Sequence, residues 1–293
     1  MENKMELQYV FDYACRAKEG DKNFGYKLSN GKCYDRYMSN DAWKKFRKEM
    51  EENDEDHYKQ YKDGNGNELD AGRYPPKMAC YGSSSRFIYN LLKGEDVIFE
   101  KKLETKVGGT ANLDAYLCKD NTEIFIEAKS REIYGSNDND ISDAYQPVYK
   151  HIHKNLPAFG EVLTSEENNK QSKYKFRYNR KKIVYLDMKQ LICHFLAISA
   201  NYLKPKKGAD TPKDKIRFIY LIYNPTKDLK IQQLNDVYNN AINEIKDIDM
   251  IKLFKVIFNY QKKENKKLKI QHDNSMPKFE FVLADQYTIK EHI

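Results

Sequence analysis

The chain has 293 residues, 40% of them hydrophobic and 32% charged, with a net charge of +7; this permits one large domain and a polyanionic partner without requiring the partner. Its longest apolar runs are far too short to cross a bilayer, so a membrane-spanning protein is not expected. Five cysteines, an odd number without a CxxC pair, and the lack of an apolar leader indicate a cytoplasmic protein with reduced thiols.

The first 80 residues are rich in charge and tyrosine, and we expect them to form a helical and loop-rich extension packed on a core of residues 81–293. Pro75-Pro76 breaks the chain between the two parts. The core begins with a predicted helix: Ser83 can cap it, apolar residues follow at helical spacing, and Gly94 can end it.

Three strands are predicted after this helix, at residues 97–107, 111–118 and 122–130, and tight turns join them. The middle strand alternates between apolar and polar residues. Asp114 is therefore expected on one face, with Leu113 and the apolar residues two and four positions after it on the other.

The hydrophobic pattern weakens between about 132 and 186, where we expect an insertion with one helix near 142–155. Asp187 and Gln190 then fit a capping box that opens a helix ending near Leu203. Later elements are predicted as a strand at 216–223, a helix, a strand near 254–259 and a last strand near 279–283. Without the insertion the order is α-β-β-β-α-β, which suits an α/β sandwich with a central mixed sheet flanked by helices.

An acid-x-Lys tripeptide recurs along the chain, but Glu127-Ala128-Lys129 differs in ending a short apolar strand that follows the strand with Asp114. In a hairpin the two carboxylates could meet, and they would repel unless a cation lay between them. Mg²⁺ takes such oxygen ligands, and a lysine beside it could orient water or stabilise transition-state charge. The residue types suit phosphodiester hydrolysis, although exposed charges on a solvated hairpin are an equal alternative from spacing alone.

These elements and residues resemble the PD-(D/E)XK superfamily of restriction-endonuclease-like nucleases, and more closely a group of uncharacterised bacterial proteins classed with restriction endonucleases. The resemblance spans roughly residues 55 to 225 and implies a restriction-endonuclease-like fold. It rests on Lys77-Met78, Gly82-Ser83-Ser84-Ser85-Arg86, Phe99-Glu100-Lys101-Lys102-Leu103, Gly108-Gly109-Thr110-Ala111-Asn112-Leu113-Asp114, Phe125-Ile126-Glu127-Ala128-Lys129, Asp187-Met188-Lys189-Gln190 with His194, and Tyr220-Leu221-Ile222-Tyr223-Asn224-Pro225.

The resemblance implies that Asp114, Glu127 and the backbone carbonyl of Ala128 bind Mg²⁺ or Mn²⁺, and that Lys129 assists the attacking water. Some superfamily members add a Gln-x-x-x-Tyr pair on the helix after the third strand. The matching residues here are Gln190 and a histidine, so Gln190 is expected to contact the lysine, the water or a DNA phosphate. Residues four apart share a helix face, so both should project toward Lys129. The role of the histidine, His194, is left open, and Leu113 replaces the proline of the family name.

Two further features have competing interpretations. Glu100 could help to hold a metal, but a solvated strand charge is the favoured interpretation. Lys173, Lys175 and Arg177 alternate with aromatic residues. On a strand they would form a cationic ridge that follows a DNA backbone, or equally a half-buried edge strand whose lysines deter aggregation.

The sequence thus predicts a Mg²⁺-dependent deoxyribonuclease, a restriction-type endonuclease, with Asp114, Glu127, Lys129 and Gln190 as its catalytic residues and DNA as its partner. Two other classes stay open: a catalytically silent nucleic-acid-binding domain of the same fold, and an α+β interaction protein whose charges coincide by chance. The recognition sequence and the oligomeric state, including a homodimer, are not determined.

Overall fold

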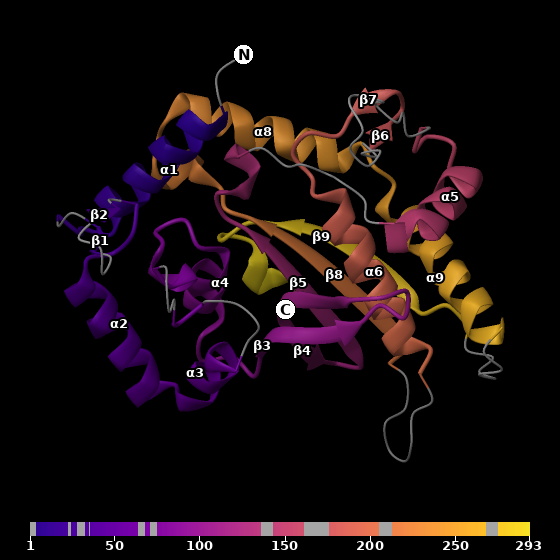
Figure 1. Cartoon of the computed structure of the whole chain (residues 1–293), viewed down its shortest axis with the longest axis horizontal. Helices are drawn as coiled ribbons and strands as arrows, with labels where there is room; N and C mark the ends of the chain where they lie inside the picture. The colour runs from indigo at the N-terminus through magenta and orange to yellow at the C-terminus, as the bar shows by residue number, and fades with distance from the viewer. Residues whose placement is uncertain are drawn as a thin grey trace.

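The computed structural model of the chain describes residues 4–22, 25–27, 33–34, 36–63, 68–70, 75–135, 143–160, 176–204, 213–267 and 275–293. At its centre is a five-stranded sheet in the order β3-β4-β5-β8-β9 (Figure 1). These strands are β3 (Ile98–Glu104), β4 (Thr110–Lys119), β5 (Thr122–Lys129), β8 (Lys215–Ile222) and β9 (Lys278–Ala284). Neighbours from β3 to β5 are antiparallel and those from β5 to β9 are parallel, so the predicted α/β class with a mixed sheet is confirmed.

The two helices that were predicted to frame the strands are present as α4 (Ser84–Leu92) and α6 (Met188–Tyr202). Ser83 caps α4 by accepting a hydrogen bond from the N–H of Arg86 at 3.2 Å. Asp187 caps α6 by accepting from the N–H of Gln190 at 2.9 Å. Together with β3, β4, β5 and β8 they give the order α-β-β-β-α-β that the sequence predicts.

The strand predicted near 254–259 is wrong, because these residues lie inside helix α9 (Met250–Lys267). The short apolar run resembled a strand when read alone. Over a longer window its buried residues, such as Leu253, Phe254, Ile257 and Phe258, repeat at the three- and four-residue spacing of a helix.

The remaining elements surround the sheet. The N-terminal 80 residues include α1 (Lys4–Lys18), β1 (Tyr26–Lys27), β2 (Cys33–Tyr34), α2 (Asn40–Asn53), α3 (Glu55–Lys62) and η1 (Lys77–Ala79). The predicted insertion includes η2 (Glu132–Tyr134), η3 (Asp143–Tyr145), α5 (Gln146–Asn155), β6 (Arg177–Tyr178) and β7 (Lys181–Lys182). The C-terminal part adds α7 (Pro225–Asp228), α8 (Gln232–Lys246) and η4 (Ile289–Glu291). Within the described ranges no helix is both long and apolar enough to cross a membrane.

Two hydrophobic cores lie on the two faces of the sheet. Residues of α1, α5, α6, α8 and α9 form one core, and residues of α2, α3 and α4 form the other (Figure 1). Strand β4 contributes to both: Leu113 belongs to the first core, whereas Ala115 and Leu117 belong to the second. The expectation that these three share one face is therefore wrong. On β3, Glu100 lies between the residues paired with Ala115 and Leu113, and its left-handed backbone, with φ 51°, departs from regular strand geometry at the same level.

The segment that leads into α6 is fixed by one side chain of α8. The carboxylate of Glu244 accepts hydrogen bonds from the N–H groups of Val184, Tyr185 and Leu186 at 2.7–3.0 Å. Because α6 begins directly afterwards, this contact ties the start of α6 to α8.

We expect Glu244→Ala to lower the free energy of unfolding by about 2–3 kcal/mol, since hydrogen bonds to a charged group are the stronger kind. Chemical denaturation monitored by circular dichroism would measure the change. Asn243→Ala, at an exposed position of the same helix, should change it by less than about 0.5 kcal/mol. Equal effects of the two substitutions would contradict the role of Glu244.

Candidate active site

The site forms where strands β4 and β5 separate. Their last paired residues are Ala115 and Ile126, and the next residues along the two strands are Asp114 and Glu127. At this point Asp114 Oδ2 accepts a hydrogen bond from the backbone N–H of Ala128 at 2.6 Å. If the pairing continued, a backbone carbonyl of β4 would accept this hydrogen bond. The Asp114 carboxylate accepts it instead, and the pairing of the two strands ends here.

The Ala128 carbonyl faces the same gap. In a strand the N–H and C=O of one residue point to the same side. Because the N–H of Ala128 points at Asp114, its carbonyl is directed toward β4. The next carbonyl, that of Lys129, points the other way and accepts from the N–H of Tyr223 at 2.9 Å. Two predicted ligands, Asp114 and the Ala128 carbonyl, thus lie on the same side of β5.

Glu127 is almost fully enclosed, with 2% of its surface exposed. Its Oε1 accepts a hydrogen bond from Lys129 Nζ at 2.6 Å. Its Oε2 lies 2.9 Å from Nε2 of His194, a residue of α6 that is itself 1% exposed. The histidine whose role the sequence left open therefore contacts the predicted metal ligand directly.

Gln190 lies one helical turn before His194 and accepts a hydrogen bond from Lys129 Nζ through its Oε1. The prediction that both α6 residues face this part of β5 is confirmed. The capping box at the start of α6 is only half formed, because the Gln190 side chain contacts Lys129 while Asp187 caps the helix.

The charges of the site shift each other's pKa values strongly. Burial, and then repulsion from Glu127, raise the pKa of Asp114 well above its usual value. Burial of Glu127 would have the same effect, but Lys129 and His194 outweigh it and lower the pKa of Glu127 to about 2. Burial disfavours a charged lysine, yet the attraction of Glu127 keeps the pKa of Lys129 well above its usual value. Glu127 and Lys129 therefore form a buried ion pair at neutral pH.

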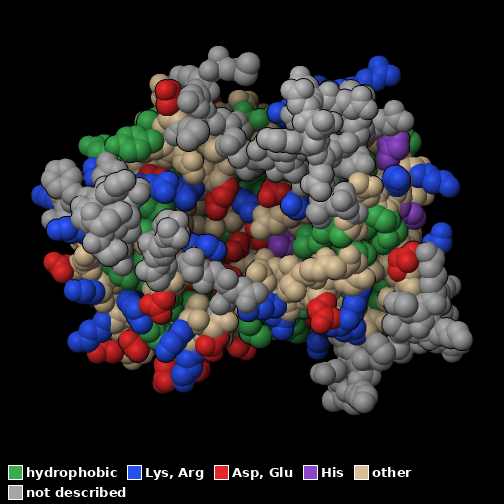
Figure 2. Space-filling model, viewed as in Figure 1, with side chains coloured by type: hydrophobic (Ala, Val, Ile, Leu, Met, Phe, Trp, Pro, Cys, Tyr) green, Lys and Arg blue, Asp and Glu red, His purple; other side chains and the backbone are tan. Residues whose placement is uncertain are grey.

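Asp114, Glu127, Lys129 and Gln190 line a pocket of about 410 Å³, which lies between the starts of α4 and α6. Figure 2 shows acidic and basic side chains gathered in the hollow at the centre of this face. The wall also includes Glu68, Lys77, Glu100, Arg131, Glu132 and Ser83 to Ser85. A pocket with charges of both signs, open to solvent, suits a charged and hydrated ligand more than an apolar one.

Several of these residues differ from what the sequence indicated. Glu100 is not the solvated strand charge that was favoured: it is half-buried and lines the pocket. Glu68 was missed, because nothing in its spacing relates it to β4 or β5. Of the predicted cationic ridge, Arg177 is exposed on the short strand β6, and Lys173 and Lys175 lie outside the described residues.

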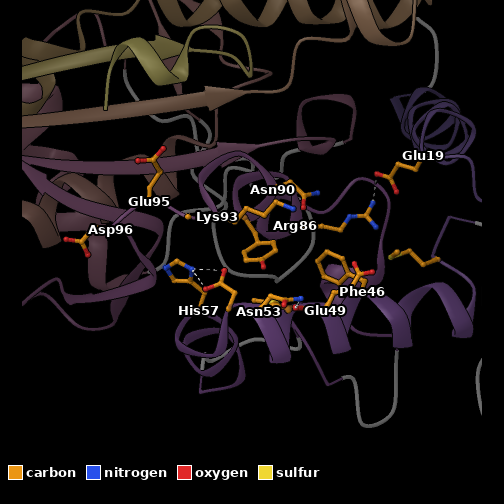
Figure 3. Close-up of a pocket in the computed structure, with 15 residues that line it drawn as sticks. Glu19, Phe46, Glu49, Asn53, His57, Arg86, Asn90, Lys93, Glu95 and Asp96 are labelled. Atoms are coloured by element: carbon orange, nitrogen blue, oxygen red, sulfur yellow. Dashed lines mark hydrogen bonds and ion pairs between the residues drawn. The ribbon is translucent and has the colours of Figure 1, made fainter.

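A second, larger cavity of about 770 Å³ lies between α4 and the helices α2 and α3 (Figure 3). An ion pair between Arg86 and Glu19, at 2.9 Å, lies toward one end of it. His57, whose Nδ1 is 2.8 Å from Asp54, lies toward the other. The predicted catalytic residues line the smaller pocket only.

The donors around Asp114 fit an open Mg²⁺ or Mn²⁺ site. Among the residues that the structure describes, no three His, Cys, Asp or Glu side chains are grouped closely enough to hold a metal ion by themselves. Mg²⁺ does not need such a group, because it is usually bound by one or two carboxylates and keeps several waters. Burial, and then the negative charge of Glu127, raise the pKa of Asp114, and a cation bound between the two carboxylates would offset both effects. Asp114, Glu127 and the Ala128 carbonyl supply suitable oxygen atoms.

Comparison of the chain with protein-family models, with curated proteins and with solved structures gives no match. The interpretation of the site therefore depends on its residues and their geometry.

The depressed pKa of Glu127 predicts a pH-dependent contribution to stability. Above about pH 4.5 the carboxylate is charged in both the folded and the unfolded state. In this range Glu127→Gln should lower the free energy of unfolding by its largest amount. The difference between wild type and variant should shrink by on the order of 3 kcal/mol as the pH falls toward 2. Urea unfolding at a series of pH values would measure it. A difference independent of pH would contradict the ion pair, and Glu51→Gln, on the exposed side of α2, is the matched control.

Proposed function

We propose that this protein is a Mg²⁺- or Mn²⁺-dependent deoxyribonuclease with a PD-(D/E)XK site in a restriction-endonuclease-like fold, and that it acts on DNA in the cytoplasm as a restriction-type endonuclease. The observation that carries the proposal is the meeting of Asp114, Glu127, Lys129 and Gln190 in one open pocket. They come from β4, β5 and α6, far apart in sequence, and their contacts match the roles that the resemblance implies.

Asp114, Glu127 and the Ala128 carbonyl would hold the ion, which supplies Lewis-acid stabilisation of charge on the phosphate oxygens. Lys129 would hold the attacking water and stabilise the negative charge that grows in the transition state. When Glu127 Oε1 serves as a metal ligand, Lys129 would lose its hydrogen bond to that oxygen. The hydrogen bond from Lys129 Nζ to Gln190 Oε1 would then keep the ammonium group in place. Nε2 of His194 lies 2.9 Å from the other oxygen of Glu127, so this histidine would help to position the carboxylate.

Two alternatives remain distinct from this proposal. If the protein were an interaction module whose charges coincide by chance, the side chains of the predicted site would lie apart. Instead, Lys129 contacts both Glu127 and Gln190. A silent nucleic-acid-binding domain would keep the fold without the chemistry. The presence of all three residue types with their contacts intact supports an active enzyme, and cleavage of plasmid DNA by the wild type decides between the two.

Asp114→Asn should reduce cleavage of supercoiled plasmid DNA by at least about 10³-fold in Mg²⁺, because loss of a metal ligand removes several kcal/mol of transition-state stabilisation. Asparagine keeps an acceptor for the N–H of Ala128, so the fold should persist. EDTA should abolish cleavage by the wild type. Asp120→Asn, in the exposed turn after β4, is the control. An Asp114→Asn enzyme within tenfold of wild type would end the assignment of this ligand.

Lys129→Met should keep DNA binding and Mn²⁺ binding but lose cleavage, because its charge is needed only in the transition state. Removing the ammonium also removes a competitor for Glu127 Oε1, so Mn²⁺ should bind at least as tightly as to wild type. Calorimetry and single-turnover cleavage would separate the two effects, with Lys119→Met at an exposed position of β4 as the control. Cleavage at saturating Mg²⁺ within about tenfold of wild type, roughly 1.4 kcal/mol, would remove Lys129 from the catalytic residues.

A further inference from the structure

Arg131 differs from the two lysines of the pocket in where its counter-ion lies. Lys77 and Lys129 pair with carboxylates that line the same pocket. Arg131 Nη1 instead lies 3.1 Å from Asp12 Oδ2 on α1, and Asp12 does not line the pocket. The charge of Arg131 is therefore balanced from outside the pocket, while 23% of its side chain is exposed.

Asp12 is enclosed, with 1% of its surface exposed. Burial, the largest effect, raises the pKa of Asp12 to about 6, although Arg131 acts in the opposite direction. Its Oδ1 is buried and has no hydrogen-bond partner among the residues that the structure describes. A buried ion pair adds little stability compared with apolar residues of the same size. What this pair does provide is a fixed orientation for the Arg131 guanidinium.

The backbone before α4 packs directly against this ion pair. A Cβ atom at Gly82 would lie 2.5 Å from Asp12 Oδ1 and 2.7 Å from Cδ of Arg131, which is closer than real Cβ atoms approach. Glycine therefore lets the pair lie against the start of α4, whose first residues form the pocket wall near Ser83. Arg131 itself lies between β5 and η2, so three segments of the chain fix the position of its side chain.

We propose that Arg131 binds a phosphate group of the DNA backbone in this pocket, and that Asp12 is the positioning residue for its guanidinium. The identity of the ligand rests on the proposed nuclease function. A guanidinium has five N–H donors in a planar fork that matches two oxygen atoms of a phosphate. The hydrogen bond to Asp12 uses Nη1 and leaves donors for such a ligand.

The contact gives the N-terminal helix a part in substrate binding. Asp12 belongs to α1, outside the part of the chain that resembles the nucleases. A phosphate contact of this kind holds the DNA backbone and carries no sequence information by itself. Its loss should therefore weaken the binding of every DNA sequence by about the same factor.

Binding of a labelled DNA duplex, measured by fluorescence anisotropy in Mg²⁺, tests the arginine. The measurement uses Lys129→Met protein so that the DNA remains uncut. In this background Arg131→Met should raise the Kd at least about tenfold, because hydrogen bonds between two charged groups are the stronger kind. Arg131→Lys should recover part of the affinity, since lysine keeps the charge without the planar fork. Arg47→Met, which removes an arginine of α2 outside the pocket, should leave the Kd within about twofold.

Asp12→Asn separates a positioning role from a structural one. With Arg131 present it should raise the Kd for DNA roughly three- to tenfold. With Arg131→Met already in place it should change the Kd by less than about twofold, because the two residues act as one unit. A purely structural role of Asp12 predicts the same loss of affinity in both backgrounds, together with a lower unfolding temperature.

Gly82→Ala repeats the test if Asp12→Asn fails to fold. The added methyl group should displace the ion pair and raise the Kd for DNA only while Arg131 is present. Gly160→Ala is the control, because the nearest atom to its added Cβ lies 3.9 Å away.

The two proposals fail separately. An unchanged Kd in Arg131→Met would overturn the phosphate contact, and equal effects of Asp12→Asn in both backgrounds would overturn the positioning role. Arg131-dependent DNA binding by a protein that cleaves no DNA would keep the contact and remove the nuclease function. Mg²⁺-dependent cleavage with DNA binding independent of Arg131 would keep the nuclease and remove the contact, and a protein that binds no DNA duplex would remove both.

Discussion

The hydrogen bond from the N–H of Ala128 to Asp114 Oδ2 is the interaction on which the site depends. The pairing of β4 with β5 ends at this hydrogen bond, directly after Ala115 and Ile126. The bond also gives the N–H of Ala128 an acceptor that it would otherwise lack. The gap that results admits oxygen atoms from two strands, and the parallel strand β8 holds the other edge of β5 in register as far as Lys129. The sheet is therefore intact on one side of β5 and open on the other.

Burial of charge at this gap is tolerated because each ion has a partner from a different element. Glu127 lies between Lys129 of its own strand and His194 of α6, and Gln190 of the same helix shares the lysine. Removing one member would leave another charge buried alone, which costs more than the pair contributes. The arrangement also explains why α6 must meet the sheet at one position, and the contacts of Glu244 with the segment before α6 help to hold it there.

The N-terminal part of the chain is a component of the site as well as a cover for the sheet. Glu68 and Lys77 precede the predicted core, yet both line the pocket. Helices α2 and α3 pack in the same hydrophobic core as α4, whose first residues form the pocket wall near Ser83. The extension and the sheet thus share one core, and Glu68 reaches the pocket of Asp114 and Glu127 only because the two parts meet.

The sequence by itself determined the α-β-β-β-α-β order, the caps at Ser83 and Asp187, and the acid-x-Lys strand end, because local periodicity and capping are readable over a few residues. It misassigned 254–259, where a short apolar run fits a strand or a helix equally well. Only the tertiary structure decided that Glu100 enters the pocket, that His194 contacts Glu127 and that Glu68 lies beside Glu100. These depend on a backbone torsion and on how α6 and the 68–70 segment pack against the sheet, and no spacing along the chain encodes such contacts between distant segments.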